Sequence, residues 1–308
     1  DSVVKALSDR DKIAQLFIFS AYSNRGVEHV AEIKKLVNEY HIGGLIFFQG
    51  GPLRQAHLTN LYQSISPTPL FIAMDAEWGL AMRLDSTIRF PKQMTMGALA
   101  SDSLVYQMGK KMAIQCKRLG VQISFSPVAD INNNPNNPVI NYRSFGENRD
   151  LVTNRSLAYM NGLQDGKVIA TAKHFPGHGD VETDSHLTLP KIDHDKNHLD
   201  SIEIYPFQKL INSGLAGMMV AHLFVPVLDA TINLATTLSK NVITDLLINN
   251  LQYQGLIFTD ALNMKGVSSF YKPGEVDVKA LLAGNDILLF PEDVPKAIEM
   301  IEAAVKRG

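Results

Sequence analysis

Eight short apolar runs alternate with segments of helical periodicity along the 308-residue chain. The runs are apolar at consecutive positions, which is typical of parallel strands that are covered by helices on both faces. Eight such units in about 300 residues predict an α/β fold, a (β/α)8 TIM-type barrel that forms a single domain over residues 1–308. A doubly wound open sheet is the alternative, but no glycine-rich dinucleotide-binding motif follows the first predicted strand.

The strands are expected where β-branched and aromatic residues are concentrated between turn-forming residues. Glycine opens the runs that begin at Gly43, Gly217 and Gly255, and a proline precedes the run that begins at Leu70. We expect strands at residues 17–20, 43–48, 70–74, 122–126, 168–172, 217–222, 255–260 and 286–290.

The helices are expected where apolar residues recur every three to four positions or where a capping residue precedes such a pattern. Val30, Ile33 and Val37 have this spacing, and Ser239 is placed to cap a helix. We expect helices at residues 8–16, 30–37, 55–64, 102–119, 151–163, 199–211, 239–249, 277–283 and 294–306.

The composition excludes several classes of protein. With 45% hydrophobic and 19% charged residues and a net charge of -2, the chain has an ordinary globular composition and no basic excess for nucleic acid. No apolar run approaches the roughly 18 residues that cross a bilayer. Cys116 is the single cysteine, so no disulfide framework is expected. The chain starts at Asp1 without an initiator methionine, which favours an exported protein of the periplasm or cell envelope, with the cytoplasm as the alternative.

A polar segment follows the fifth predicted strand at residues 173–186 and reads KHFPGHGDVETDSH. It combines a lysine and three histidines with acidic residues. Pro176, Gly177 and Gly179 disfavour both helix and strand, so we expect a loop that begins at Lys173. Loops at the tips of buried strands commonly carry functional groups.

Ionisable residues occupy the carboxyl ends of the predicted strands, where (β/α)8 barrels place their active sites. Burying a charge without a partner is costly, so this convergence predicts a functional site. Asp130 has the alternative of organising an asparagine-rich turn, and His222 that of a hydrogen-bonded structural residue. The residues at these ends are Asp75, Asp130, Lys173, His174, His222 and Asp260.

Asp260 closes the seventh predicted strand, and residues 261–264 add no other charge. If it faces a rim that carries Lys173 and Arg143, its ionised form is stabilised. An ionised carboxylate suits the nucleophile of glycosyl transfer. Asp184 and His186 lie two residues apart, so Asp184 can hydrogen-bond one ring nitrogen and leave the other to exchange a proton. A hydrogen bond that only organises the loop is the alternative for this pair.

The segment 173–186 resembles the signature of the glycoside hydrolase family 3 β-N-acetylglucosaminidases (NagZ-type). The signature residues are Lys-His-Phe-Pro-Gly-His-Gly-Asp followed by Asp-Ser-His. The resemblance continues at residues 90–91, 142–146, 258–264 and 283–286, and so covers nearly the whole chain.

This resemblance implies a retaining exo-β-N-acetylglucosaminidase that acts on peptidoglycan fragments (muropeptides) or chitooligosaccharides and needs no cofactor or metal. It implies that Asp260 is the nucleophile and that His186, oriented by Asp184, is the general acid/base. The sugar-binding residues that it implies are Asp75, Arg83, Arg143, Lys173 and His174. The sequence departs from the family at Trp78, in place of glycine, and at Leu80, in place of arginine, and these two positions bear on the shape of the sugar pocket and its entrance.

Three other functions stay open from the residues alone. A metal-dependent hydrolase is one, because histidines and acids on a barrel rim can bind a metal. An aldolase that uses Lys173 as a Schiff-base amine is another. A non-catalytic sugar-binding domain on the same fold is the third. The candidate metal ligands of the first alternative are His174, His178, Asp180, His186 and His222.

Overall fold

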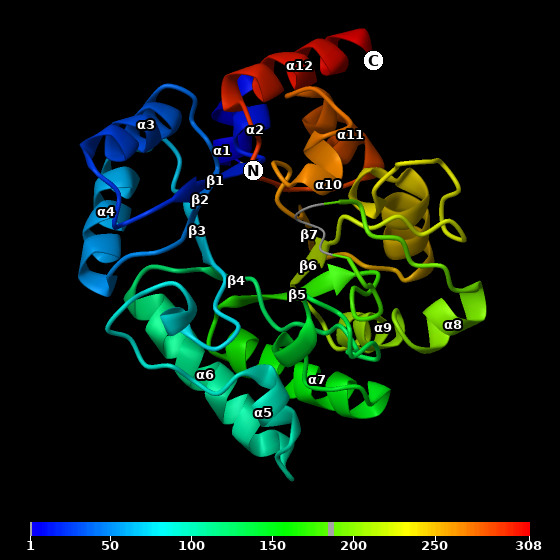
Figure 1. Cartoon of the computed structure of the whole chain (residues 1–308). Coiled ribbons are helices and arrows are strands. Elements are labelled where there is room, and N and C mark those ends of the chain that lie inside the picture. Colours follow the sequence, from blue (N-terminus) through cyan, green and yellow to red (C-terminus); the bar gives the residue numbers. More distant parts are fainter. Residues whose placement is uncertain (1, 184–187) are drawn as a thin grey trace.

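The computed structural model describes residues 2–183 and 188–308 and confirms the predicted (β/α)8 barrel (Figure 1). All adjacent strands pair in parallel, in the order β7-β6-β5-β4-β3-β2-β1-β8. An isolated bridge between Phe258 and Ile287 joins the two ends of this order and nearly closes the barrel. The strands are β1 Phe17–Ala21, β2 Gly44–Phe47, β3 Phe71–Met74, β4 Ile123–Ser124, β5 Ile169–Phe175, β6 Gly217–Val220, β7 Leu256–Thr259 and β8 Leu288–Leu289.

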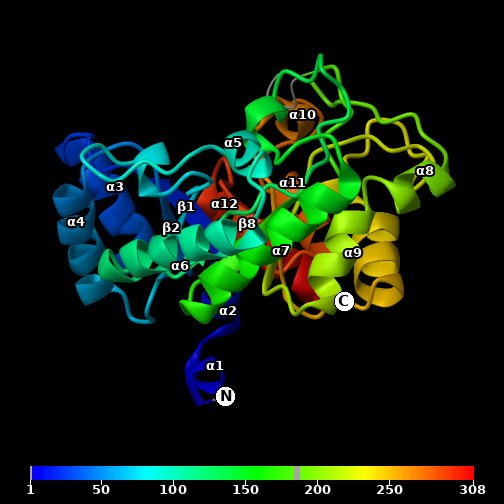
Figure 2. The same ribbon diagram turned by 90° about the horizontal axis from the view of Figure 1, so that it is seen from below.

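Helices surround the barrel, while irregular segments and short helices gather at one of its ends (Figure 2). The long loops that carry α5, α8 and α10 lie toward this end, and α1 lies at the other. The helices are α1 Ser2–Ala6, α2 Asp9–Ala14, α3 Val27–Asn38, α4 Pro52–Ile65, η1 Leu80–Met82, α5 Gln93–Gly97, α6 Asp102–Arg118, η2 Asn141–Arg143, α7 Arg149–Asp165, α8 Lys196–Ser201, α9 Tyr205–Asn212, η3 Thr236–Leu238, η4 Asn241–Asn250 (a π-helix), α10 Lys265–Ser268, α11 Glu275–Ala283 and α12 Val294–Arg307.

In most strands, alternate residues belong to two separate apolar cores. In β2, Leu45 and Phe47 pack in the large core that the helices share, whereas Ile46 packs in a smaller core. The period of two follows from the pleat of a strand, so the smaller core is the interior of the barrel. It is formed by Ile18, Ile46, Ala73, Ile123, Phe125, Met219, Phe258 and Leu289.

The strand β5 is longer than predicted and includes the start of the polar segment. Lys173 accepts a backbone hydrogen bond from Ala129 N–H and donates one to Pro127, so the strand continues. After a register shift, Phe175 pairs with Val220 of β6. The prediction of a loop from Lys173 onward was wrong because tertiary partners satisfy these polar side chains inside the barrel.

Two predicted helices also differ from the structure. The helix expected at 199–211 is divided into α8 and α9, because Pro206 occupies the first turn of α9 and cannot continue a preceding helix. The helix expected at 239–249 is the π-helix η4, a difference that no feature of the structure explains. Within the two stretches that the structure describes, no helix is both long and apolar enough to cross a membrane.

Candidate active site

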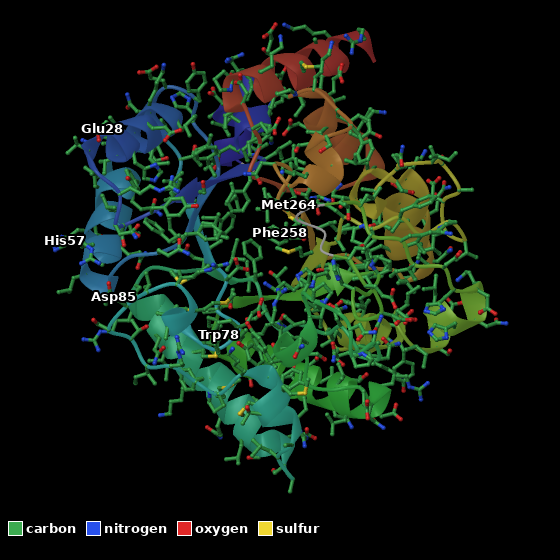
Figure 3. All side chains as sticks on the ribbon, viewed as in Figure 1. Glu28, His57, Trp78, Asp85, Phe258 and Met264 are labelled. Atoms are coloured by element: carbon green, nitrogen blue, oxygen red, sulfur yellow. The ribbon has the colours of Figure 1, made fainter. Side chains whose placement is uncertain are left out.

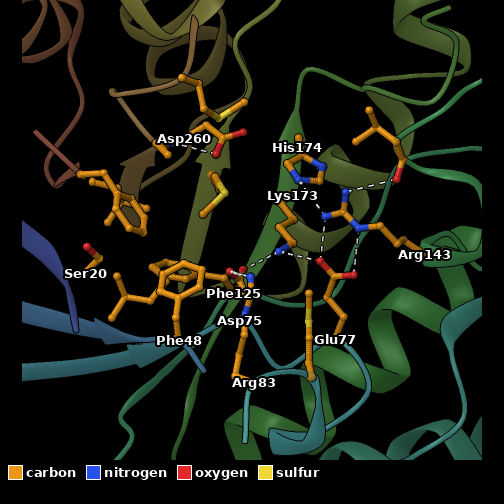
Figure 4. Close-up of a pocket in the computed structure, with 18 of the residues that line it drawn as sticks. Ser20, Phe48, Asp75, Glu77, Arg83, Phe125, Arg143, Lys173, His174 and Asp260 are labelled. Carbon is orange, nitrogen blue, oxygen red and sulfur yellow. Dashed lines mark hydrogen bonds and ion pairs between the residues drawn. The ribbon is translucent and has the colours of Figure 1, made fainter. Parts of the chain in front are cut away.

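A cavity of about 460 Å³ opens at the carboxyl ends of the strands (Figure 4). Its volume is within the range of small-molecule sites. Ile46, Phe125 and Leu289 of the inner core form part of its lining, so the packed barrel interior closes it from below. Its polar and aromatic lining includes Asp75, Glu77, Arg83, Arg143, Lys173, His174, Asp260, Tyr22, Phe48, Trp78 and Tyr142.

Asp75 follows β3 directly and pairs with two cations. Its Oδ1 accepts a hydrogen bond from Lys173 Nζ at 2.8 Å. Its Oδ2 accepts one from an Arg83 guanidinium nitrogen at 2.5 Å. Arg83 follows the short helix η1. The segment after β3 therefore folds back so that Arg83 contacts Asp75, the residue with which the segment begins.

Glu77 lies beside Asp75 and is fully buried. Its two oxygens accept hydrogen bonds from Arg143 Nη2 at 2.7 Å and Arg143 Nε at 3.0 Å, which is a bidentate pair. Lys173 Nζ is also 2.8 Å from Glu77 Oε1. Lys173 therefore joins two carboxylates, and a continuous set of ion pairs runs from Arg83 to Arg143 (Figure 4).

These ion pairs determine the charge states of the group. Burial raises the pKa of Asp75, but Lys173 and Arg83 outweigh burial and hold that pKa well below its ordinary value. Burial acts on Glu77 in the same way, yet Arg143 and Lys173 lower its pKa to about 2. Burial favours neutral Lys173, whereas Asp75 and Glu77 together raise its pKa. All of these groups are therefore charged at neutral pH.

His174 is held by a buried carboxylate beneath the cavity. Asp130 Oδ2 is 2.7 Å from His174 Nδ1 and also accepts the backbone N–H of His174. The other oxygen accepts the backbone N–H of His178 at 2.8 Å. This arrangement leaves His174 Nε2 toward Arg143, at 3.4 Å from Nη2. Asp130 thus positions a cavity residue and does not line the cavity itself.

Asp260 follows β7 and lies across the cavity from Glu77 and Arg143 (Figure 4). Its Oδ1 accepts a hydrogen bond from Ala261 N–H at 2.8 Å. Burial raises its pKa, but His222, His174, the Ala261 N–H and Lys173 outweigh burial and lower it. The sequence predicted an ionised Asp260 that is stabilised by Lys173 and Arg143, whereas the structure gives the larger effect to the two histidines.

His222 contacts the residue that follows Asp260. Its Nδ1 is 2.7 Å from Thr237 Oγ1, and its Nε2 is 2.9 Å from the carbonyl oxygen of Ala261. It is fully buried and does not line the cavity. His222 therefore anchors the backbone that carries Asp260.

The structure brings six of the eight predicted site residues to one cavity: Asp260, Asp75, Arg83, Arg143, Lys173 and His174. The remaining two, Asp184 and His186, lie outside the described residues, so their predicted pairing stays a prediction. Sequence reasoning missed Glu77. A signal was present, because Glu77 is a carboxylate two residues after Asp75, at a strand end between Ala76 and Trp78.

The histidines of the alternative metal site have separate partners. His174 pairs with Asp130, His222 with Thr237, and Asp180 with His194. In the part of the chain that the structure describes, Asp180 is the one member of that set that belongs to a group with metal-ligand spacing. The described part of the predicted rim therefore does not form a single metal centre.

Trp78 lies at the edge of the cavity with other aromatic and cationic groups (Figure 3). Its ring is edge-on to that of Tyr142, with the centroids 6.4 Å apart. Lys92 Nζ lies 5.2 Å from the Trp78 ring centroid and 3.3 Å from that of Tyr142. The departure from the family pattern thus places an aromatic surface beside the ion-paired group.

Comparisons with known proteins agree with this geometry. Residues 9–308 match the glycosyl hydrolase family 3 N-terminal domain. Beta-hexosaminidase A of Pseudoalteromonas piscicida is 36% identical over 283 residues, which are 84% of this chain and 47% of the relative. Beta-hexosaminidase LpqI of Mycobacterium tuberculosis is 32% identical over an alignment of 317 residues, which covers 98% of this chain and 78% of the relative.

A solved structure is similar over the same region. The glycoside hydrolase family 3 beta-N-acetylglucosaminidase from Paenibacillus sp. FPU-7 superposes with a TM-score of 0.92 at 36% identity, over 98% of this chain and 59% of that protein. The chain therefore spans about half the length of the first of these relatives, 47%, and 59% of this solved structure. By its barrel, its cavity and these similarities, the chain belongs to glycosyl hydrolase family 3.

Proposed function

We propose that this chain is the catalytic barrel of a retaining exo-β-N-acetylglucosaminidase. The observation that carries the proposal is the position of Asp260, an ionised carboxylate at the tip of β7 that faces a preorganised group of cations and carboxylates across one cavity. A carboxylate of lowered pKa is suited to attack an anomeric carbon and form a glycosyl-enzyme. The relatives named beta-hexosaminidase support the N-acetylhexosamine class of substrate.

The sugar-binding role belongs to the opposite wall of the cavity. Asp75 accepts hydrogen bonds, and Arg83, Lys173 and Arg143 donate them, as the hydroxyl groups of a sugar require. Their mutual ion pairs hold them in place before substrate arrives. Fixed donors and acceptors lose little entropy on binding, which favours a productive orientation of the sugar.

Acid/base catalysis is assigned to His186, oriented by Asp184. In this proposal His186 protonates the leaving oxygen while Asp260 attacks, and then deprotonates the water that releases the sugar. The assignment rests on the family resemblance of the segment 173–186, because both residues lie outside the described part of the chain.

The exo mode of action is proposed from the family resemblance, and the closed floor of the cavity is compatible with it. Because inner-core residues such as Phe125 and Leu289 block the barrel interior, a chain cannot thread through it and a terminal sugar fits best. Peptidoglycan fragments and chitooligosaccharides are the proposed substrates. A location in the periplasm or cell envelope remains a sequence-based prediction.

The test compares Asp260→Ala and His186→Ala on aryl N-acetyl-β-glucosaminides. We expect Asp260→Ala to lower kcat by at least about 10³-fold on all of them, because the nucleophile is lost. His186→Ala should lower the rate by about 10²-fold or more on a poor leaving group and much less on a good one. Asp85→Asn is the matched control, because Asp85 is 60% exposed and pairs with Arg54 away from the cavity.

The outcomes separate the alternatives. Wild-type rates in both variants would overturn the assigned roles. A wild-type chain that binds N-acetylglucosamine but cleaves no chromogenic substrate would be a sugar-binding domain. Loss of activity on chelation without a fall in Tm would favour a metal-dependent hydrolase.

A further inference from the structure

Four potential metal ligands lie together outside the cavity. They are Asp180, His194, His198 and Glu203, and their ligand atoms all lie within 4.8 Å of one another. His194 Nε2 is hydrogen-bonded to the Asp180 carboxylate, and His198 Nε2 is 3.3 Å from Glu203 Oε1. The imidazole rings of His194 and His198 are stacked, with the centroids 3.9 Å apart and the planes 23° apart. Both Nε2 atoms therefore face carboxylates of the same group.

Glu203 is the unusual member because its side chain is only 3% exposed. Its Oε1 accepts a hydrogen bond from Asn133 Nδ2 at 3.3 Å, but its buried Oε2 has no hydrogen-bond partner among the described residues. A buried carboxylate oxygen without a partner is rare and costly in native proteins. Because this oxygen belongs to one of the four potential metal ligands, it indicates that a further atom, such as a metal ion, binds there.

The surrounding backbone fixes Glu203 in this position. Gly177 has a φ of +139°, and a Cβ at this residue would lie 2.6 Å from the Glu203 Cβ. At Gly179, a Cβ would lie 1.7 Å from the carbonyl oxygen of Ile131. The turn that leads to Asp180 is therefore packed directly on Glu203 and on the barrel, and the group does not depend on a loosely held loop.

We propose that Asp180, His194, His198 and Glu203 form a binding site for a divalent transition metal of the zinc type. Imidazole nitrogens and carboxylate oxygens are both ligands of Zn²⁺, and four of them suit its tetrahedral geometry. Neutral imidazoles with two carboxylates also balance the charge of the ion. Mg²⁺ and Ca²⁺ prefer six or more oxygen ligands, so the two histidines select against them.

The position of the ligands gives the ion a structural role. Asp180 and His194 stand at the two ends of the segment 181–193, while His198 belongs to α8 and Glu203 precedes α9. An ion at this site would link both ends of the segment to α8 and to the residue that precedes α9. The site is separate from the cavity, since none of its four residues lines it, and it stands independently of the proposed function.

The test measures metal binding to the whole chain after it has been stripped with a chelator. We expect about one Co²⁺ per chain, with the intense visible absorption bands of tetrahedral cobalt, and displacement of Co²⁺ by Zn²⁺. Glu203→Gln and His198→Ala should each weaken Zn²⁺ binding by at least about tenfold in competition with a chromophoric chelator. His57→Ala is the control, because His57 is an exposed histidine of α4 on the opposite side of the molecule (Figure 3).

A second readout keeps the test independent of folding defects. Zn²⁺ should raise the Tm of the wild-type chain and of His57→Ala, and should leave the Tm of His198→Ala unchanged. His198 is 37% exposed, so its replacement should preserve the fold, which far-UV circular dichroism checks. Absence of stoichiometric binding, or equal affinity in wild type, Glu203→Gln and His198→Ala, would overturn the site. Neither readout involves turnover, so failure here is distinct from failure of the proposed glycosidase.

Discussion

The two walls of the cavity hold their carboxylates in different ways. On one wall, Asp75 and Glu77 are each bonded to two cations. On the other wall, Asp260 accepts the N–H of Ala261 and forms no ion pair within 4.0 Å with any residue in the described ranges. Carboxylates whose oxygens are occupied by cations are weak nucleophiles but well-fixed acceptors. The same functional group is thus fixed by cations on one wall, whereas on the other wall it has no ion pair with the described residues.

The two walls also complement each other in charge. Arg83, Lys173 and Arg143 contribute three positive charges against the two negative charges of Asp75 and Glu77. The excess positive charge faces Asp260 and contributes, through Lys173, to its lowered pKa. The paired wall therefore adds to the effects of His222 and His174 that favour ionised Asp260.

The largest expected difference between the two walls is in how much a substitution lowers the free energy of unfolding. Glu77→Ala should lower the free energy of unfolding by about 3–5 kcal/mol, because it leaves Arg143 and Lys173 buried without a shared counter-ion. Asp260→Ala should change it by less than about 1 kcal/mol, since Asp260 has no ion pair with any of the described residues. Urea denaturation of the two variants and the wild type measures both values. Equal losses in the two variants would remove the distinction between the walls.

A smaller effect should appear in the pH dependence of stability. The pKa of Glu77 is about 2 in the folded chain, below its ordinary value of 4.5. The stability that ionised Glu77 contributes is therefore complete above pH 4.5 and is lost as the pH falls toward 2. Glu77→Gln lacks this titration, so its stability deficit relative to wild type should shrink with decreasing pH by at most about 1.4 kcal/mol per pH unit.

Urea denaturation at a series of acidic pH values measures this deficit, and Asp260→Asn serves as the comparison from the other wall. The lowered pKa of Asp260 gives its titration the same sign, but within the described residues Asp260 forms no direct ion pair, and the largest lowering effects come from His222 and His174. We expect a weaker change for Asp260→Asn than for Glu77→Gln. A Glu77→Gln deficit that stays constant from neutral to acidic pH would show that Glu77 is not held ionised by its partners.

The sequence predicted the barrel and much of the site because both depend on local patterns. Apolar runs show where strands lie, and the residue after each run lies at the rim, which is how Asp75 and Asp260 were found. Side-chain partners across the barrel are not encoded locally. Glu77 depends on Arg143, and Asp130 acts on His174; in each pair the two residues come from different parts of the chain.

The same limit explains the error at β5. Proline and glycine in the segment 173–186 predicted a loop from its first residue, since local propensity is set by composition. The strand nevertheless continues to Phe175, because Asp75 accepts a hydrogen bond from Lys173 Nζ and Asp130 pairs with His174 Nδ1 inside the barrel. Tertiary ion pairs overrode the local preference.

The smallest expected effect concerns Trp78, which extends the paired wall toward the edge of the cavity. If its ring supports the sugar that follows the terminal one, Trp78→Ala should raise KM for a disaccharide substrate several-fold, which corresponds to about 1 kcal/mol of binding free energy. KM for an aryl monosaccharide should stay unchanged. The control Phe270→Ala removes an aromatic ring that is 44% exposed and does not line the cavity. Equal changes in KM for both substrates would place Trp78 in the terminal-sugar pocket. No change for either substrate would show that Trp78 only packs against Tyr142 and Lys92. A selective change would show that the paired wall continues beyond the pocket of the terminal sugar.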